Sequence, residues 1–230
     1  IQYGQMDFTL PHDVVMLPSR GVFYKNKKDS LKVGYLTASD ENILLAGGKD
    51  MTLNLLRAKI YEPTMKPEEL MEGDVEAILI FLRNTSFGSD MEITVTDPAT
   101  GNPFKTMVDL GEMDIKKGKT PDEDGTWTIF LPVSQKNVKL KPLTFSQSIE
   151  LSNQLAAYPQ GRVAPRRTLR LQKEIVSIEG NTDKGEIAKF VEQMPLADSK
   201  TIKKFMDDNE PRLDLGRVVI APSGEKLTVN

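Results

Sequence analysis

The chain has 230 residues, of which 39% are hydrophobic and 27% are charged. This composition is typical of a globular fold, and the length suits one large domain or two small ones. The 30 basic and 33 acidic residues leave a net charge of −3, which argues against a general binder of nucleic acid or anionic membranes. There is no cysteine, so disulfides, thiolate metal sites and cysteine nucleophiles are excluded and a reducing compartment is favoured.

His12 is the only histidine. A histidine metal cluster is therefore excluded, and a Ser–His–Asp triad would have to use His12. No apolar stretch reaches the roughly 18 residues that a membrane span needs, and the longest, Val75–Leu82, is interrupted by Glu76. The chain begins at Ile1 rather than Met, so trimming of its N-terminus stays open.

The N-terminal stretch is predicted to form two strands joined by a turn. Apolar residues at Val14–Leu17 lead to Pro18, which pre-sets the turn, and to Gly21, which can take the positive φ that closes it. After a polar loop, Leu31–Leu36 alternates between apolar and polar residues, as a half-buried strand does.

The apolar spacing then becomes helical, up to about residue 88. Three helices are expected, each beginning after a residue whose side chain can cap it. Gly47-Gly48 ends the first helix and Pro63 ends the second. The expected caps are Thr37 or Ser39, then Asp50, then Asp74.

The pattern next returns to β and ends in a helix. The charged loop Lys116–Gly125 separates predicted strands, and Trp127, the only tryptophan, lies in one of them. Thr144 or Ser146 is expected to cap a helix that runs to about Tyr158. The predicted strands are Met107–Leu110, Thr126–Leu131 and Val138–Leu143.

The last third of the chain mixes loops, helices and a final strand. Pro159–Thr168 is rich in Pro, Gly and Arg and is expected to be an exposed loop or hinge. Leu169–Ile178 is compatible with strand or helix, and we interpret it as a strand. The elements expected after it are a helix at Asp183–Met194, a helix at Lys200–Asn209 capped by Ser199, and a strand at Arg217–Ile220.

Two strand–turn–strand segments, Ile93–Phe104 and Val218–Val229, form a worn internal repeat. In zinc ribbons such a knuckle carries Cys-x-x-Cys, and two knuckles hold one zinc ion. The cysteines are absent here, so the repeat predicts a structural part in which the two knuckles meet, and the alternative is two ordinary hairpins. The knuckle positions are Asp97, Pro98, Thr100 and Gly101 in the first turn and Ala221, Pro222 and Gly224 in the second.

Four short motifs occur in a distinctive order. They are Leu-Pro-Ser-x-Gly-x-x-Tyr at Leu17–Tyr24, Thr-Ala-x-x-Glu-x-Ile-Leu at Thr37–Leu44, Gly-Asp-x-x-Ala-Ile-Leu at Gly73–Leu79 and Pro-x-Leu-Asp-Leu at Pro211–Leu215. With the two knuckles, they resemble the baseplate hub assembly protein family of T-even-type contractile-tailed bacteriophages. Many members carry Cys-Pro-x-Cys-Gly at both knuckles. Here the cysteines are replaced and the second knuckle is one residue shorter, so zinc binding is not carried over.

The resemblance implies a structural or assembly role in the hub region of a phage tail baseplate. Its implied partners are other tail proteins, without specific nucleic acid and without a membrane span. The implied location is the virion, in the tail baseplate, after assembly in the host cytoplasm. A transient tail-assembly chaperone that is absent from the mature virion is the alternative, and the resemblance leaves open which of the two applies and the oligomeric state.

The densest positive charge of the sequence lies in the predicted loop Pro159–Thr168 and directly after it. Near Tyr158 it could hold phosphates, but interleaved aromatic residues are missing and the chain is acidic overall. A basic loop that docks an acidic partner protein is therefore favoured, because arginine is enriched at interfaces. Further contacts are expected at Lys116–Gly125 and at Leu17–Tyr24. The residues expected to contact partners are Arg162, Arg166, Arg167, Arg170, Pro18, Arg20 and Tyr24.

Catalytic patterns are weak. His12 is expected to be a surface residue, and neither a nucleophile elbow nor a phosphate loop occurs. The carboxylates of Glu68–Asp74 and Asp122–Asp124 are typical of solvated faces, so a carboxylate-based enzyme or small-ligand binder is a distant alternative. Asp97 and Glu225 are too few ligands for a calcium site. We expect no enzyme, no cofactor and no metal.

Together these elements predict an α+β fold. Its β-rich module would contain the N-terminal strands and the two paired knuckle hairpins, beside a helical block and an inserted α/β segment. The expected segments, which can form one compact unit, are 1–36 (N-terminal β), 37–90 (helical block), 91–143 (first β module with knuckle 1), 144–210 (helical insertion) and 211–230 (C-terminal strand and knuckle 2).

Overall fold

The computed structural model describes residues 10–159 and 161–230 and confirms the mixed α+β class. The described strands form four small antiparallel sheets, ordered β1–β2, β3–β4, β5–β6–β7 and β8–β9. The strands are β1 His12–Met16, β2 Ser30–Gly34, β3 Asp90–Thr96, β4 Pro103–Asp109, β5 Trp127–Leu131, β6 Lys136–Leu140, β7 Ile175–Ile178, β8 Arg217–Ile220 and β9 Lys226–Val229. The helices are α1 Asp40–Ala46, α2 Met51–Lys59, the 3-10 helix η1 Pro67–Glu69, α3 Glu72–Phe87, α4 Phe145–Ala156, α5 Arg166–Glu174, α6 Lys184–Glu192 and α7 Leu196–Asn209.

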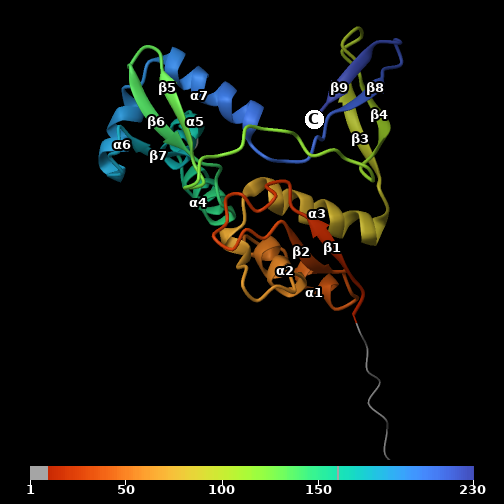
Figure 1. Cartoon of the computed structure of the whole chain (residues 1–230). Coiled ribbons are helices and arrows are strands. Elements are labelled where there is room, and N and C mark those ends of the chain that lie inside the picture. Colours follow the sequence, from red (N-terminus) through yellow and green to blue (C-terminus); the bar gives the residue numbers. More distant parts are fainter. Residues whose placement is uncertain (1–9, 160) are drawn as a thin grey trace, which may run out of the picture.

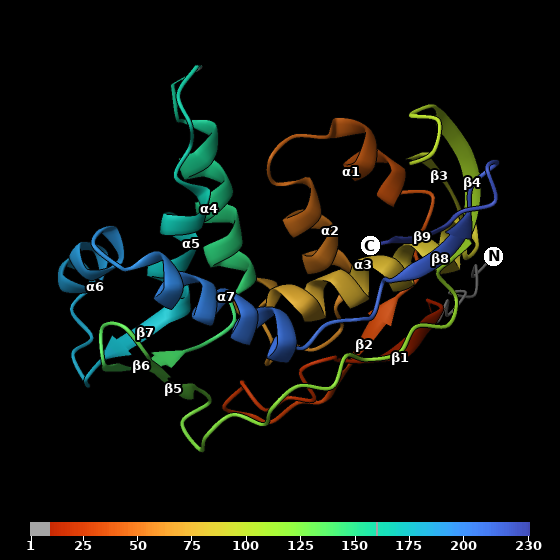
Figure 2. The same ribbon diagram turned by 90° about the horizontal axis from the view of Figure 1, so that it is seen from above.

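The elements form three parts around α3 (Figures 1 and 2). The N-terminal part contains β1, β2 and α1–α3, the α/β part contains β5–β7 and α4–α7, and the knuckle pair contains β3, β4, β8 and β9. Two linkers, residues 110–126 and 210–216, run alongside each other above α3 between the α/β part and the knuckle pair (Figure 1). Backbone bonds join them, from Lys116 N to Arg212 O at 2.9 Å and from Asp214 N to Asp114 O at 2.7 Å.

The N-terminal hairpin packs on the helices and not beside the knuckles, which differs from the module expected from the sequence. β1 pairs with β2 so that Val15 lies opposite Leu31. Leu31 and Val33 are buried in the main core with Leu56 of α2 and Ile78 of α3. A two-stranded sheet with one apolar face needs a covering layer, and in the N-terminal part α2 and α3 supply it.

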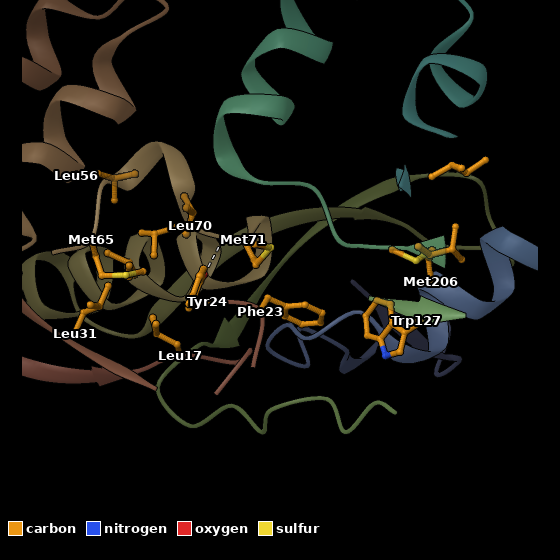
Figure 3. Packing of buried hydrophobic residues seen from close by; sticks show 14 of the residues in the cluster. Leu17, Phe23, Tyr24, Leu31, Leu56, Met65, Leu70, Met71, Trp127 and Met206 are labelled. Carbon is orange, nitrogen blue, oxygen red and sulfur yellow. Dashed lines mark hydrogen bonds between the residues drawn. The ribbon is translucent and has the colours of Figure 1, made fainter. Parts of the chain in front are cut away.

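The turn between β1 and β2 joins the N-terminal part to the α/β part (Figure 3). The rings of Phe23 and Trp127 meet edge to face with centroids 5.2 Å apart, and Trp127 meets Phe205 of α7 at 5.6 Å. Such aromatic pairs add to the free energy of apolar burial. Trp127 also donates from Nε1 to the carbonyl oxygen of Lys119 at 2.8 Å. One tryptophan thereby fixes the turn, α7 and the first linker.

The knuckle hairpins pack against each other, as the repeat predicted. Val108, Leu110 and Val219 form a second small core, with Ile93 and Leu227 packed against it. This core is separate from the main core. The knuckle pair therefore depends on few apolar contacts of its own.

Two predicted helix starts are correct in position and differ in chemistry. At α4 the Oγ1 of Thr144 accepts from Gln147 N at 3.3 Å and the Oε1 of Gln147 accepts from Thr144 N at 3.0 Å, a capping box. At α1 the expected cap Thr37 is a donor and not an acceptor, because its N–H donates to the side chain of Asp40 at 2.6 Å. Asp50 precedes α2 without a side-chain cap bond.

The strand interpretation of Leu169–Ile178 is wrong for its first part, which is helix α5 as far as Glu174; the strand β7 begins at Ile175. The helix is favoured because Leu171 is buried while Arg170 and Glu174, four residues apart, form an ion pair of 2.7 Å. The short apolar alternation was compatible with both structures, and long-range contacts decide between them.

Two helices begin earlier than the sequence suggested. α5 begins directly after Pro165, so the loop is shorter than Pro159–Thr168. α7 begins directly after Pro195 and not after Ser199. Proline at a helix start loses no hydrogen bond, because the first N–H groups have no partner within the helix.

Candidate functional site

The carboxylate of Asp74 is a buried meeting point of two motifs. It accepts from Ser19 N at 2.9 Å, from Ser19 Oγ at 2.5 Å and from the hydroxyl of Tyr24. The Tyr24 oxygen in turn accepts from Met71 N at 2.8 Å (dashed line in Figure 3). Asp74 therefore does not cap α3, which begins at Glu72, and instead holds the β1–β2 turn on the first turn of that helix.

No cation neutralises this cluster among the residues that the structure describes. Burial raises the pKa of Asp74 above its ordinary value, although the bonds from Ser19 and Tyr24 oppose the shift. Burial, together with the neighbouring Asp74, also raises the pKa of Tyr24. The arrangement is thus a fixed polar joint, since a buried carboxylate tolerates no missing donor.

The C-terminal motif meets the same place. A Cβ at Gly73 would lie 2.0 Å from the carbonyl oxygen of Pro211, so only glycine lets the second linker lie against the start of α3. Three of the four motifs therefore converge. In the fourth motif, Asp40 forms a buried ion pair of 2.5 Å with Lys59 of α2, which joins α1 to α2.

Residues expected to contact partners fall into buried and exposed groups. Pro18 and Tyr24 are buried, so the surface role expected for them is not available in this structure. Arg20 is exposed. It lines a basic pocket of about 250 Å³ between the turn and the first linker. The structure thus brings two of the predicted contact segments together, with the basic lining residues Arg20, Lys116, Lys117 and Lys119.

Arg167 and Arg170 are half-buried and form bonds within the protein. Arg170 binds Glu72 of α3 at 2.8 Å and Glu174 at 2.7 Å, and reaches Glu210 at 3.5 Å. Arg167 lies 3.4 Å from Glu174 and donates to the carbonyl oxygen of Ser199 at 3.2 Å. These two arginines therefore join α3, α5 and α7. Carboxylates that the sequence placed on solvated faces, Glu72 among them, belong to this network.

Arg162 and Arg166 remain exposed, as does Val163, which is 95% exposed between them. Neither arginine forms an ion pair with another residue in 10–159 or 161–230. They lie at the end of the α/β part where α4 and α5 are connected (Figure 2). Contact with a partner stays a prediction for these residues and for Arg20.

The knuckle turns are similar but differ by one residue in length, because the closing bond spans four residues in the first turn and three in the second. Gly101 N donates to Asp97 O at 2.8 Å, and Gly224 N donates to Ala221 O at 2.8 Å. Both glycines have positive φ, 71° and 90°, a conformation that costs glycine little. The two turns also touch, since Ser223 donates from Oγ to Asp97 Oδ1 at 2.9 Å and from N to Asp97 Oδ2 at 3.1 Å.

These turns do not fit a zinc ion. The side chains that meet are one carboxylate and one hydroxyl, whereas zinc sites use thiolate, imidazole and carboxylate ligands in fours. The described residues contain no group of three His, Cys, Asp or Glu placed to hold a metal. Burial disfavours the charge of Asp97, but bonds from Ser223 and from backbone amides hold its pKa below the ordinary value. A hydrogen-bonded carboxylate thus joins the two turns.

The polar residues of the family-like motifs and of α5 thus mostly join parts of this chain to one another. A family model described as T4 bacteriophage base plate protein matches residues 19–216, and the chain belongs to this family. Its class is therefore that of phage baseplate structural proteins. Neither a curated protein nor a solved structure matches the chain. Within the described part of the chain, no helix is both long and apolar enough to cross a membrane.

The sequence did not predict the long-range bonds of Asp74 or those of the arginines of α5. An Asp at a helix start usually signals a cap, and nothing local showed that Asp74 binds a turn 55 positions away. Charge counting found the arginines of α5 but not their partners Glu72 and Glu210. The spacing of Arg170 and Glu174 was the one signal that could have shown it.

We expect Asp74→Ala to lower the free energy of unfolding by about 3 kcal/mol, because three buried donors lose their acceptor. Tyr24→Phe should cost about 1–2 kcal/mol. The double variant should lose less than the sum, since both changes remove one shared bond. Urea denaturation measures all three. Asp50→Ala, which removes an aspartate without a cap bond, is the control, and additive losses would contradict the joint.

We expect Arg170→Met to make stability depend on pH. Burial already raises the pKa of Glu210. The positive charges of Arg212 and Arg170 lower this pKa, whereas the negative charges of Glu72 and Glu174 raise it further. Without Arg170 that pKa rises further. A raised folded-state pKa adds stability below the unfolded value near 4.5 and loses it as pH rises. The variant should therefore lose about 3–5 kcal/mol near pH 8 and less at pH 5.

Urea denaturation at both pH values checks this. Lys189→Met is the control, because Lys189 of α6 pairs with Glu186 at 2.8 Å and the two side chains are 72% and 57% exposed. Exposed pairs of this kind contribute about 0–1 kcal/mol. An equal loss at pH 5 and pH 8 in Arg170→Met would show that the carboxylates do not form one coupled network.

We expect Asp97→Ala to loosen the contact between the knuckle turns while the main core stays intact. Bonds to a charged acceptor are worth about 1.5–3 kcal/mol, so the amide of Ser223 should exchange with solvent roughly 10–100 times faster. Hydrogen exchange read by NMR measures it, with Ile78 in α3 as internal reference. Glu225→Ala, an exposed residue of the same turn, should change nothing, and slow exchange in Asp97→Ala would contradict the proposed clamp.

Proposed function

We propose that this protein acts in the hub region of the tail baseplate and holds other tail proteins through protein–protein contacts. The observation that carries the proposal is a division among the polar residues. Ser19, Tyr24 and Asp74, which belong to the family-like motifs, form hydrogen bonds with one another inside the protein. Arg20, Arg162 and other basic residues nearby are exposed and have no carboxylate partner among the described residues.

The extended surface supports the same role. The whole chain of 25.7 kDa exposes 14261 Å², whereas a compact monomer of that mass exposes about 10,400 Å². Residues 1–9 and 160 account for at most about 1,600 Å² of the difference, the surface of ten unfolded residues. A chain with this much remaining surface is suited to contacts with several neighbours.

A transient tail-assembly chaperone is the second candidate. It would use the same exposed basic residues and then leave, so that the protein would occur with tail proteins in host cytoplasm and not in virions. Quantitative mass spectrometry of purified particles and of infected-cell lysate separates the two. A fixed copy number in particles supports the hub role, presence only in lysate bound to tail proteins supports the chaperone, and lack of any tail association contradicts both.

We expect charge reversal at two exposed patches to block assembly without unfolding. One variant combines Arg162→Glu with Arg166→Glu, and the other combines Arg20→Glu with Lys117→Glu. Loss of steered, complementary contacts should lower incorporation or tail-complex binding by tenfold or more. Co-purification with tail proteins and complementation of a deletion phage measure the effect.

The control reverses Lys136 and Lys226, which are exposed on β6 and β9 and lie outside both patches. Circular dichroism and thermal unfolding should be close to those of the unmodified protein in every variant, since exposed substitutions change stability by about 0.5 kcal/mol or less. Normal incorporation of both patch variants would contradict the proposed contact surfaces.

A further inference from the structure

A groove of about 690 Å³ separates α3 from the knuckle pair, and the function proposed above does not involve it. One wall is a face of α3 and the other is the inner face of β3 and β4, where Met91, Ile93 and Val108 lie. The linkers and the first turn of α4 limit it. Figure 1 shows the elements that contribute its lining residues, with α3 below and β3, β4 and β8 of the knuckle pair above it.

The α3 wall has the spacing of a helix-docking face. Its lining residues recur at intervals of three and four, which places them in one stripe along the helix. From Glu72 to Arg83 the stripe is about 16 Å long, or three helical turns. The stripe consists of Glu72, Val75, Glu76, Leu79, Ile80 and Arg83.

The groove leaves two buried polar atoms without hydrogen-bond partners: Oε2 of Glu76 and Nε of Arg212. Such orphans are few in folded proteins and call for an explanation. Burial raises the pKa of Glu76, although Arg212 opposes the shift. Both residues line the groove, so a small shift of their side chains would bring these atoms within reach of a polar or charged group from outside.

The charges that border the groove are mainly positive. Arg83 donates to the carbonyl oxygens of Gly88 and Asp90 at 2.8 and 2.9 Å. Arg217 donates to backbone carbonyl oxygens only, such as that of Asp109 at 2.9 Å. Neither arginine forms an ion pair with a residue that the structure describes.

The two glutamates that line the groove do not cancel this positive charge. Glu72 is paired with Arg170 at 2.8 Å, and Arg212 reaches a carboxylate, that of Glu210, only at 3.9 Å. The groove thus has an apolar floor and a rim on which the guanidinium groups of Arg83 and Arg217 donate only to side-chain amide and backbone carbonyl oxygens within this chain. Arginine binds carboxylates well because its fork of donors matches their two oxygens.

We propose that this groove binds an acidic amphipathic α-helix of a partner protein. Apolar side chains at positions i, i+3 or i+4, and i+7 of that helix would lie against Leu79, Ile80 and Met91. Its carboxylates would face Arg83 and Arg217. A helix placed there also completes a layer between α3 and the β3–β4 sheet, the usual way in which a sheet face and a helix stripe are covered.

Charge decides among the possible occupants. A basic or neutral helix would leave the arginines uncompensated and would be disfavoured. The site exists whether or not the protein resides in the hub, because its lining residues all belong to this chain.

The first experiment is a display selection with the full chain as target. The library encodes peptides of about 15 residues, four helical turns, and Ile80→Asp serves for counter-selection. The expected result is enrichment of sequences with helical apolar spacing and Asp or Glu beside it. Selected peptides should bind Ile80→Asp at least tenfold more weakly. Enrichment of basic peptides, or of sequences without helical spacing, would overturn the proposal.

The second experiment needs no destabilising change. The chain has no cysteine, so Ile80→Cys introduces a unique thiol in the groove and Ile220→Cys introduces one on β8, where Ile220 is 65% exposed. A selected acidic peptide at saturation should slow maleimide labelling about tenfold or more for Ile80→Cys and leave Ile220→Cys unchanged. Equal protection of both thiols, or of neither, would overturn the site.

A second copy of the chain is the competing occupant. Sedimentation of the unmodified protein and of Ile80→Asp distinguishes it. A monomer in both cases supports the external helix, whereas a dimer that Ile80→Asp dissolves would overturn the proposal in favour of self-association.

Discussion

The bond network around the Asp74 carboxylate is the contact on which the arrangement of the parts depends. It attaches the β1–β2 turn to α3. The same turn places the ring of Phe23 against that of Trp127 in the α/β part. Gly73, the preceding residue, admits the second linker against the same helix turn. Because no described cation shares the site, its stability rests on three donors that must all stay in place. Motifs that look functional in the sequence are thus explained by folding.

Local signals predicted the elements that local chemistry decides. The capping box of Thr144, the turns of the two knuckles and the α6 helix capped by Asp183 all follow from residues within a few positions. The strand interpretation of Leu169–Glu174 was wrong because alternation over so short a stretch does not separate strand from helix. What decided it was the ion pair of Arg170 with Glu174, which the spacing of four residues could have shown, together with contacts with α3 and α7, which sequence spacing does not show.

The candidate site was less predictable than the fold, because charge in a sequence carries no information about partners. Arg166 and Arg167 are neighbours in the chain, yet one is exposed and the other lies against Glu174. Tyr24 looked like a surface aromatic residue, but a buried tyrosine is stable when its hydroxyl is bonded, and here Asp74 and Met71 supply both bonds. Pairing over long separations turned predicted contact residues into joints.

The knuckle pair shows why the groove beside it matters. Its own core has three buried apolar residues. A zinc ion, which contributes folding energy directly in zinc ribbons, does not fit its residues. The Asp97–Ser223 contact joins its two turns. Its position over α3 rests on the linkers and on bonds from α3, such as that from Asn84 Nδ2 to the carbonyl oxygen of Leu110 at 2.6 Å. Contacts of this size give a small barrier to local opening. A helix bound between α3 and the knuckle inner face would bury both surfaces and add its binding free energy to that position, so partner binding and the order of the knuckle pair are expected to be coupled in both directions.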